Sequence, residues 1–237
     1  MVKILAIIPA RGGSKGIKNK NIINFCGKPL IYWTIKAAQN SKLINKVIVS
    51  TDSKKISAIA ESYNVKKTDL RPKKYSTDNA TTLSVLKYEI KNLEKKKYYP
   101  DVIVTLQPTS PLRNSEHIDL ALKKFLKNKK ADSLVSCIAV PHNFNPKSLM
   151  KIKNKYLIEV ERNKIYSRHK KNIFYARNGA AIYITKRKII DKKIFNDNTL
   201  PFEMDCFSSV DIDTKDDIVI GSLFYKYLKD KNEKKNK

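Results

Sequence analysis

The chain has 237 residues, of which 41% are hydrophobic and 30% are charged. That length suits one α/β domain with a substantial core and is short for two independent domains. The formal net charge is +27, and the basic residues are spread along the chain without a helix-turn-helix or an arginine-rich arm. We therefore expect no specific nucleic-acid partner, although such a surface attracts anionic substrates.

The cysteines and the apolar runs bear on the cellular compartment. Cys26, Cys137 and Cys206 lie far apart, without a CxxC pair, and no histidine pair has metal-ligand spacing, so neither a disulfide nor a zinc site is indicated. The first apolar run, 4–10, is too short to span a membrane and lacks a signal-peptide cleavage region. No other uncharged run approaches membrane length, so we expect a cytoplasmic protein with no membrane partner.

The apolar run 4–10 has the length of a strand and leads into a loop, 11–16, that holds three of the six glycines of the chain. A glycine loop lets backbone N–H groups approach anionic oxygens, and Arg11, Lys15 and Lys20 supply positive charge beside it. The loop therefore predicts a polyphosphate site, with a simple glycine turn among surface lysines as the alternative. Its spacing fits neither the Walker motif nor the dinucleotide fingerprint.

Helical and strand patterns alternate along the rest of the chain. Apolar periodicity and turn residues predict helices at 30–39, 54–63, 83–93, 115–127 and 215–228, and strands at 47–50, 101–106, 131–140 and within 177–184. Asn114 or Ser115 is the expected cap of the fourth helix. The alternation predicts an α/β fold with a mostly parallel sheet flanked by helices and with ligand chemistry at the carboxyl ends of the strands. We expect a single domain over 1–229 and a disordered charged tail over 230–237.

Two polar loops accompany these elements. Residues 70–82 are polar and turn-forming, and by themselves they indicate a loop that ends in a helix N-cap. The segment 107–113 follows a buried strand and carries two prolines around Thr109 and Ser110. The prolines stiffen this loop and leave polar side chains aimed outward, which suits the wall of a site for a polyhydroxy ligand.

A pair of aspartates near the C-terminus is the last chemical signature. In an extended segment, residues two apart face the same side, so Asp211 and Asp213 can offer carboxylate oxygens to one ion. Magnesium binds such oxygens together with water and substrate phosphates, so the pair predicts a magnesium site. The competing interpretation is that Asp213 or Thr214 caps the helix that follows, with Asp216 and Asp217 favouring its dipole. The two interpretations are compatible.

Four segments carry a resemblance to a known family. The run Ile-Pro-Ala-Arg-Gly-Gly-Ser-Lys-Gly, followed by Lys20 and Asn21, resembles the signature of the CMP-sialic acid synthetase family, the acylneuraminate cytidylyltransferases. Segments 70–82, 107–113 and 177–213 match further motifs of that family in the same order. The resemblance implies a Rossmann-like nucleotidyltransferase fold and transfer of CMP from CTP to the anomeric hydroxyl of a nonulosonic acid. Pyrophosphate would be released, and Mg²⁺ would be the cofactor.

The resemblance also implies roles for individual residues. Contacts to CTP are implied for Arg11, Gly12, Ser14, Lys15, Lys20, Asn21, Arg71, Asp78 and Thr81. Contacts to the acceptor are implied for Gln107, Arg168, Tyr183 and Phe195, the last of which also fits a position in the core. Arg11, Lys20 and Asp211 are expected to be catalytic, and Asp211 and Asp213 to hold the metal. No side chain stands out as a general base, because the three histidines fall outside the matching motifs.

The segment 141–173 breaks the alternating pattern and indicates an insertion or a hairpin excursion. The resemblance makes it an arm exchanged between the subunits of a homodimer, with Arg168 offered to the substrate of the partner. The chain departs from the family at Arg177, which directly precedes Asn178, whereas the family often places its arginine one residue earlier. No contact is therefore carried over to Arg177.

Two alternatives to N-acetylneuraminate activation stay open. Sister enzymes that act on legionaminic or pseudaminic acid share the chemistry, and the glycine loop makes an octulosonate enzyme the least favoured of these relatives. From a different class, a nucleic-acid-binding α/β protein would account for the charge but would leave the segment 107–113 and the aspartate pair unexplained.

Overall fold

A computed structural model describes residues 2–14, 16–66, 68–141, 144–160 and 173–235. The strands are β1 (Ile4–Pro9), β2 (Asn24–Phe25), β3 (Lys28–Pro29), β4 (Lys46–Ser50), β5 (Val102–Thr105), β6 (Ser133–Ala139), β7 (Met150–Lys153), β8 (Tyr156–Glu159), β9 (Tyr175–Arg177), β10 (Tyr183–Lys186) and β11 (Thr199–Glu203). The α-helices are α1 (Leu30–Gln39), α2 (Lys54–Ser62), α3 (Thr82–Lys95), α4 (Ser115–Lys127), α5 (Arg187–Ile190) and α6 (Lys215–Lys235). Among the described residues, no helix is both long and apolar enough to cross a membrane.

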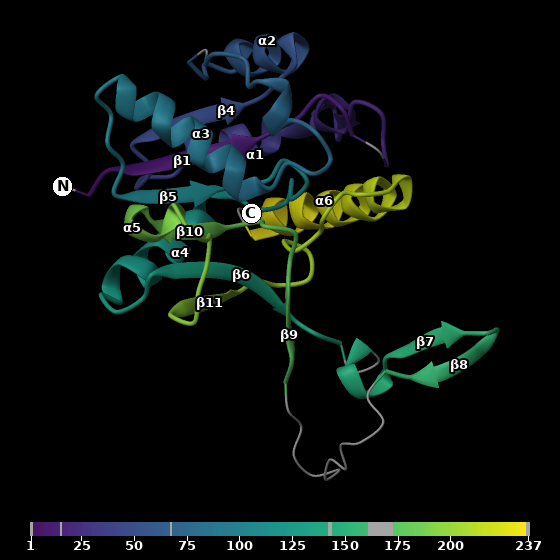
Figure 1. Ribbon diagram of the computed structural model, residues 1–237. Coiled ribbons are helices and arrows are strands. Elements are labelled where there is room, and N and C mark those ends of the chain that lie inside the picture. The colour runs from purple at the N-terminus through teal and green to yellow at the C-terminus, as the bar shows by residue number, and fades with distance from the viewer. Residues whose placement is uncertain (1, 15, 67, 142–143, 161–172, 236–237) are drawn as a thin grey trace.

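One mixed sheet forms the centre of the protein (Figure 1). Its strand order is β11-β6-β10-β5-β1-β4, and β9 pairs with β6 beyond this path. Strands β4, β5 and β11 each run parallel to a neighbour, whereas β10 and β9 are antiparallel to theirs. The predicted mostly parallel sheet flanked by helices is therefore confirmed.

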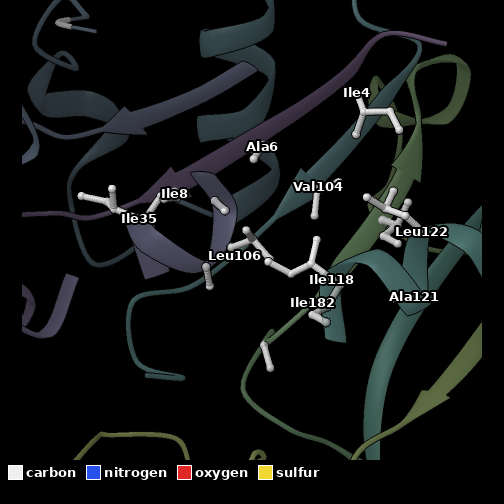
Figure 2. Packing of buried hydrophobic residues seen from close by; sticks show 14 of the residues in the cluster. Ile4, Ala6, Ile8, Ile35, Val104, Leu106, Ile118, Ala121, Leu122 and Ile182 are labelled. Carbon is white, nitrogen blue, oxygen red and sulfur yellow. The ribbon is translucent and has the colours of Figure 1, made fainter. Parts of the chain in front are cut away.

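The two faces of the sheet are covered by different helices. Ile4, Ala6 and Ile8 of β1 pack with α1 and α4, whereas Leu5 and Ile7 pack with α3. This alternation follows from the two-residue period of a strand, and burial on both faces explains why the run is apolar without interruption. Figure 2 shows the larger cluster, in which side chains of α4 lie against those of β1 and β5.

Replacing Leu122 with alanine tests this packing. The side chain is fully buried on α4, whereas Leu120 on the same helix is 47% exposed. Leu122→Ala is expected to lower the free energy of unfolding by about 2–5 kcal/mol in urea titrations, because it removes buried methyl groups and leaves a cavity. Leu120→Ala is the matched control and should change it by less than about 0.5 kcal/mol. Equal losses in both variants would contradict the packing.

The predicted helix starts agree with the caps. Asn114, and not Ser115, caps α4, since its side chain accepts a hydrogen bond from the His117 backbone N–H at 2.9 Å. Thr214, and not Asp213, caps α6, and its hydroxyl accepts from the Asp217 N–H at 3.3 Å while the Asp217 carboxylate accepts from the Thr214 N–H at 2.7 Å. This reciprocal pair leaves the Asp213 side chain available for another role.

Three features differ from the sequence-based expectations. The β2–β3 hairpin was not predicted, because its strands have two residues each and its turn uses Cys26 and Gly27 at positive φ. The short elements α5 and β11 were also missed. Helix α6 continues to Lys235, so residues 230–235 are helical and the predicted disordered tail is wrong there. Lysines and acids are good helix formers at exposed positions, and Lys229 pairs with Glu233 at 3.9 Å one turn later.

The excursion between β6 and β9 contains a hairpin, β7–β8, that lies apart from the sheet (Figure 1). Ile152 is paired with Leu157 across the hairpin, and their side chains are 76% and 62% exposed. Arg168, which the resemblance places in this excursion, lies outside the described residues.

Candidate active site

A cavity of about 500 Å³ opens at the carboxyl ends of β1 and β5. Segments from four parts of the sequence line it: the glycine loop, the loop before α3, the loop after β5, and the segment before α6. This is the edge of a parallel sheet where ligand sites are expected. Most of the residues predicted to bind CTP line this cavity: Arg11, Ser14, Lys20, Asn21, Arg71 and Asp78.

The glycine loop is held by close backbone contacts. The Gly12 N–H donates to Asp52 Oδ1 at 2.8 Å, and Asn21 Nδ2 donates to the Arg11 carbonyl at 2.9 Å. A Cβ on Gly16 would lie 2.7 Å from the backbone oxygen of Asp213, so a larger residue there would push the loop away from the segment before α6. Glycine at this position brings the predicted phosphate loop and the predicted metal ligands together.

Two ion pairs link cavity-lining residues that are distant in sequence. Arg11 Nη1 lies 2.8 Å from Asp78 Oδ1, and Lys20 Nζ lies 2.6 Å from Asp213 Oδ1. Both basic residues were predicted to bind phosphates, and Lys15, their predicted partner in this role, lies outside the described residues. Both predicted phosphate-binding cations are therefore paired with carboxylates in the structure.

Arg71 lines the cavity although only 4% of its surface is exposed. Its Nε donates to Ser76 Oγ at 3.0 Å. Burial lowers the pKa of the guanidinium, while the charges of Asp52 and Glu89 raise it. Glu89 is itself buried in α3 and accepts a hydrogen bond from Ser50 Oγ at 2.6 Å. Sequence reasoning did not identify Asp52 or Glu89, because one follows a strand without a motif and the other lies within a helical pattern.

Glu89→Gln tests the buried charge beneath Arg71. Burial raises the pKa of Glu89 above its ordinary value of 4.5, despite the opposing Ser50 hydrogen bond and Arg71 charge. A carboxyl with a raised folded pKa stabilises the fold most when protonated, and this contribution is lost as the pH rises through the folded pKa. The wild type should therefore lose stability relative to Glu89→Gln in urea titrations as the pH rises above 4.5, the ordinary pKa of a glutamate. A difference that does not change with pH would contradict this.

The loop after β5 forms another wall of the cavity. Gln107 and Thr109 line it, and the Thr109 carbonyl accepts a hydrogen bond from the Ile212 N–H at 2.8 Å. Arg113 supports the loop from within the core, where burial lowers its pKa to about 9. Its guanidinium donates to Thr34 Oγ1 at 2.7 Å, to the Ala181 carbonyl at 3.0 Å and to the Gln107 carbonyl at 3.4 Å. Arg113 thus ties the predicted acceptor loop to α1 and to the turn before β10.

Asp211 and Asp213 flank the buried side chain of Ile212, as expected for an extended segment. Asp211 Oδ1 is buried and has no hydrogen-bond partner among the described residues. Burial raises the pKa of Asp211, the Thr109 hydroxyl lowers it, and the charge of Asp213 raises it further. A buried, unpartnered carboxylate oxygen beside a second carboxylate is suited to a divalent cation.

Two further observations bear on such a cation. Across the described part of the chain, no three acidic, histidine or cysteine side chains gather as metal ligands. Magnesium sites in phosphate chemistry use one or two carboxylates together with water and substrate oxygens. Gly179, at φ +66°, lies directly against the Asp211 carboxylate, which any Cβ at this position would overlap.

The other predicted acceptor residues form a cluster next to this carboxylate. Tyr183 is 7% exposed and meets Phe195 edge to face, with ring centroids 6.0 Å apart. The guanidinium of Arg177 lies 5.3 Å from the centre of the Phe195 ring. Burial raises the pKa of Tyr183, whereas the charge and hydrogen bond of Arg177 lower it, and Asp211 is near enough to raise it. Phe195 is 38% exposed in this cluster, and Arg177 joins it although no family contact was carried over to it.

Among the described residues, five predicted site residues do not line the cavity: Gly12, Thr81, Tyr183, Phe195 and Asp211. The Thr81 hydroxyl accepts a hydrogen bond from the Ser84 N–H at 3.2 Å and caps α3, which is the role expected of an isolated polar loop. Its neighbours Tyr75, Ala80 and Thr82 line the cavity instead. These three carried no signal of their own in the sequence, since only their position in the folded loop directs them inward.

Comparisons with known proteins agree with this geometry. The sequence model of a family described as Cytidylyltransferase matches residues 5–221. The chain is 37% identical to the N-acylneuraminate cytidylyltransferase of Escherichia coli O18:K1:H7, in an alignment that covers 92% of this chain and 51% of that protein. It is 29% identical to the pseudaminic acid cytidylyltransferase of Campylobacter jejuni strain 81-176, with 95% and 97% covered. The chain thus spans about half the length of the N-acylneuraminate cytidylyltransferases that it matches.

Solved structures support the fold. A CMP:2-keto-3-deoxy-manno-octonic acid synthetase complexed with CTP superposes with a TM-score of 0.68 at 16% identity, covering 96% of this chain and 99% of the other. At that identity the likeness concerns the Rossmann-like nucleotidyltransferase fold alone. The family match, in contrast, runs through most of the sequence and includes every segment that lines the cavity. The protein therefore belongs to the cytidylyltransferase family.

Proposed function

We propose that the protein transfers CMP from CTP to the anomeric hydroxyl of a nonulosonic acid, with N-acetylneuraminate as the first candidate. The observation that carries the proposal is the cavity itself. It combines a glycine loop flanked by Arg11 and Lys20 with Arg71 and Gln107 in one lining. A triphosphate needs such concentrated positive charge, and a sugar acid needs polar side chains next to it.

Within this cavity, each group of residues has a separate task. The glycine-loop N–H groups, Ser14, Arg11 and Lys20 would hold the phosphates, and Asn21 and Arg71 would hold the nucleoside. Gln107 would orient the acceptor, with Tyr183 and Phe195 on its far side. Holding the two substrates in line supplies much of the rate enhancement in phosphoryl transfer, because little covalent chemistry is left for the protein.

Magnesium would be held by Asp211 and Asp213, which fit it because one offers a buried oxygen without a partner and the other an exposed carboxylate. When bound, the ion would polarise the α-phosphate and lower the pKa of a nearby hydroxyl. The acceptor oxygen forms a bond to the α-phosphorus as the bond to pyrophosphate breaks, without a covalent enzyme intermediate. The proton of the attacking hydroxyl has no evident histidine acceptor: His117 lies in the N-terminal cap of α4, and His142 and His169 lie outside the described residues.

The identity of the acceptor is the finer part of the proposal. A pseudaminic acid cytidylyltransferase is matched over nearly its whole length, whereas the matched N-acylneuraminate enzymes are about twice as long as this chain. Pseudaminic or legionaminic acid therefore stays as the alternative acceptor. These sugars share the carboxylate and the anomeric hydroxyl, so small changes around Tyr183 and Phe195 would decide between them.

Pyrophosphate release from CTP tests the proposal. The enzyme is incubated with CTP and Mg²⁺ and, in separate reactions, with N-acetylneuraminate, legionaminate, pseudaminate or deoxyoctulosonate. Release with one of these acids, and none without it, is the expected result. Folded protein that releases no pyrophosphate with any acid in the panel would count against the reaction.

We further propose a homodimer formed through the β7–β8 hairpin. An isolated two-stranded hairpin is marginally stable in water, and this one carries Met150, Ile152 and Leu157 on one exposed face. A second copy of the chain would cover that face and stabilise the hairpin. We also propose a cytoplasmic location, which the three free cysteines and the use of a nucleoside triphosphate support.

Aspartate substitutions on the two hairpin faces test the dimer. Ile152→Asp places a charge on the apolar face and is expected to halve the mass measured by light scattering, because a buried, unpaired charge is costly. Lys151→Asp places the same side chain on the opposite face of β7 and should leave the mass unchanged. A monomeric wild type, or equal effects of the two substitutions, would contradict the dimer.

A further inference from the structure

Lys20 has an acidic environment that its predicted role at phosphates does not explain. Its ammonium lies 2.6 Å from Asp213 Oδ1, and 16% of its side chain is exposed. It also interacts electrostatically with Asp211 and Asp217. Lys20 thus contacts the carboxylate of Asp213 and is within electrostatic range of Asp211, the two predicted metal ligands. Lys20 therefore supplies positive charge at the two carboxylates that are predicted to hold the metal.

A second ion pair, Arg11–Asp78, also lines the cavity. Arg11 Nη1 and Asp78 Oδ1 lie 2.8 Å apart, with 33% and 48% of the two side chains exposed. Each of these cations must therefore exchange an aspartate for a phosphate when a nucleotide binds. Two of the three basic side chains that line the cavity, Arg11 and Lys20, are thus each paired with an aspartate.

These ion pairs disfavour the binding of free metal and the binding of free nucleotide alike. A divalent ion arriving alone has to compete with the Lys20 ammonium for Asp213 and is repelled by it. A nucleotide arriving without metal has to draw Lys20 away and leaves the two metal-site carboxylates facing its phosphates without a counter-ion. The metal complex of the nucleotide avoids both costs, because the ion replaces Lys20 at the aspartates while the phosphates take Lys20.

We propose that the Lys20–Asp213 ion pair makes the site selective for the metal–nucleotide complex over either component alone. The proposal rests on the proposed function, and it gives Lys20 a second role beyond phosphate binding. It leads to an unusual expectation: removing the charge of a substrate-binding lysine should strengthen metal binding. A lysine that served phosphates alone would leave metal affinity in the absence of nucleotide unchanged.

The test measures Mn²⁺ binding without any turnover. Free Mn²⁺ is followed by electron paramagnetic resonance as the protein is titrated, with and without CTP. For the wild type, CTP is expected to strengthen Mn²⁺ binding. For Lys20→Gln, the Mn²⁺ affinity without CTP should rise about tenfold, the effect expected of removing one unit charge a few ångströms from the ion. The added effect of CTP should shrink correspondingly.

Two control variants isolate the ion pair. Lys18→Gln makes the same change of charge at an exposed position in the same loop and should leave Mn²⁺ affinity near that of the wild type, because solvent screens the more distant charge. Lys20→Arg keeps the cation and should retain the low affinity. Near-ultraviolet circular dichroism shows that each variant is folded.

Equal Mn²⁺ affinities for Lys20→Gln, Lys18→Gln and the wild type would overturn the proposal, as would weaker binding in Lys20→Gln. A wild type whose Mn²⁺ binding does not respond to CTP would also overturn it. These results are separate from the proposed function, which is read from pyrophosphate release. An active wild type with unchanged metal binding in Lys20→Gln would reject the ion-pair selectivity and leave the cytidylyltransferase reaction standing.

Discussion

Asp211→Asn is expected to lower magnesium-dependent pyrophosphate release by roughly 1,000-fold, because the proposed metal ligand would supply several kcal/mol of transition-state stabilisation. The same variant should unfold at a temperature equal to or above that of the wild type. Burial raises the pKa of Asp211, so its ionised form costs stability at neutral pH, and the neutral amide of similar shape removes that cost. Lost activity without lost stability is the signature of a functional carboxylate.

Asp216→Asn is the matched control for this prediction. It changes the same charge in the same region, in the exposed first turn of α6, and should reduce the rate by less than about twofold. The rate reduction in Asp213→Asn should lie between those of Asp211→Asn and Asp216→Asn, because Asp213 is 68% exposed and its oxygens are partly replaceable by water. Steady-state rates at saturating CTP and a range of Mg²⁺ concentrations check all three. A near-normal rate for Asp211→Asn would remove Asp211 from the site.

The fold could be predicted from the sequence where the pattern is local and repeated. The apolar run in β1 and the periodic faces of α1, α3 and α4 depend on neighbouring residues, so their positions were predicted within about two residues. The β2–β3 hairpin and α5 are too short for any period to show, and they depend on contacts with distant segments. The end of α6 was missed because high charge indicated disorder, whereas spaced lysines and acids also suit an exposed helix.

The residues of the candidate site also fall into those that the sequence could predict and those that it could not. Residues inside motifs, such as Arg11 and Arg71, line the cavity together. Glu89 could not be found, because a glutamate in an amphipathic helix normally faces water, and only the fold places this one beneath Arg71. The contact between Gly179 and Asp211 joins residues that are 32 positions apart in the sequence, and it exists only because the turn before β10 approaches the segment before α6.

Gly179→Ala should therefore reduce both turnover and stability, turnover by about 100-fold or more. An alanine Cβ would overlap the Asp211 carboxylate and displace it from the position in which it faces Asp213. The positive φ of +66° adds a backbone cost of about 1–2 kcal/mol for any residue with a Cβ. Rates at saturating CTP and urea titrations measure the two losses separately.

Two further variants separate the overlap from the backbone cost. Gly27 also has a positive φ, +84°, but nothing lies within 4 Å of its would-be Cβ. Gly27→Ala should therefore lose stability by about 1–2 kcal/mol and keep its turnover, since only the backbone is strained. Combining Gly179→Ala with Asp211→Ala removes the carboxylate that the methyl group would meet. The double variant should therefore lose less unfolding free energy than the two single variants lose in sum. Strict additivity would mean that Gly179 serves the turn alone and does not position the metal-site carboxylate.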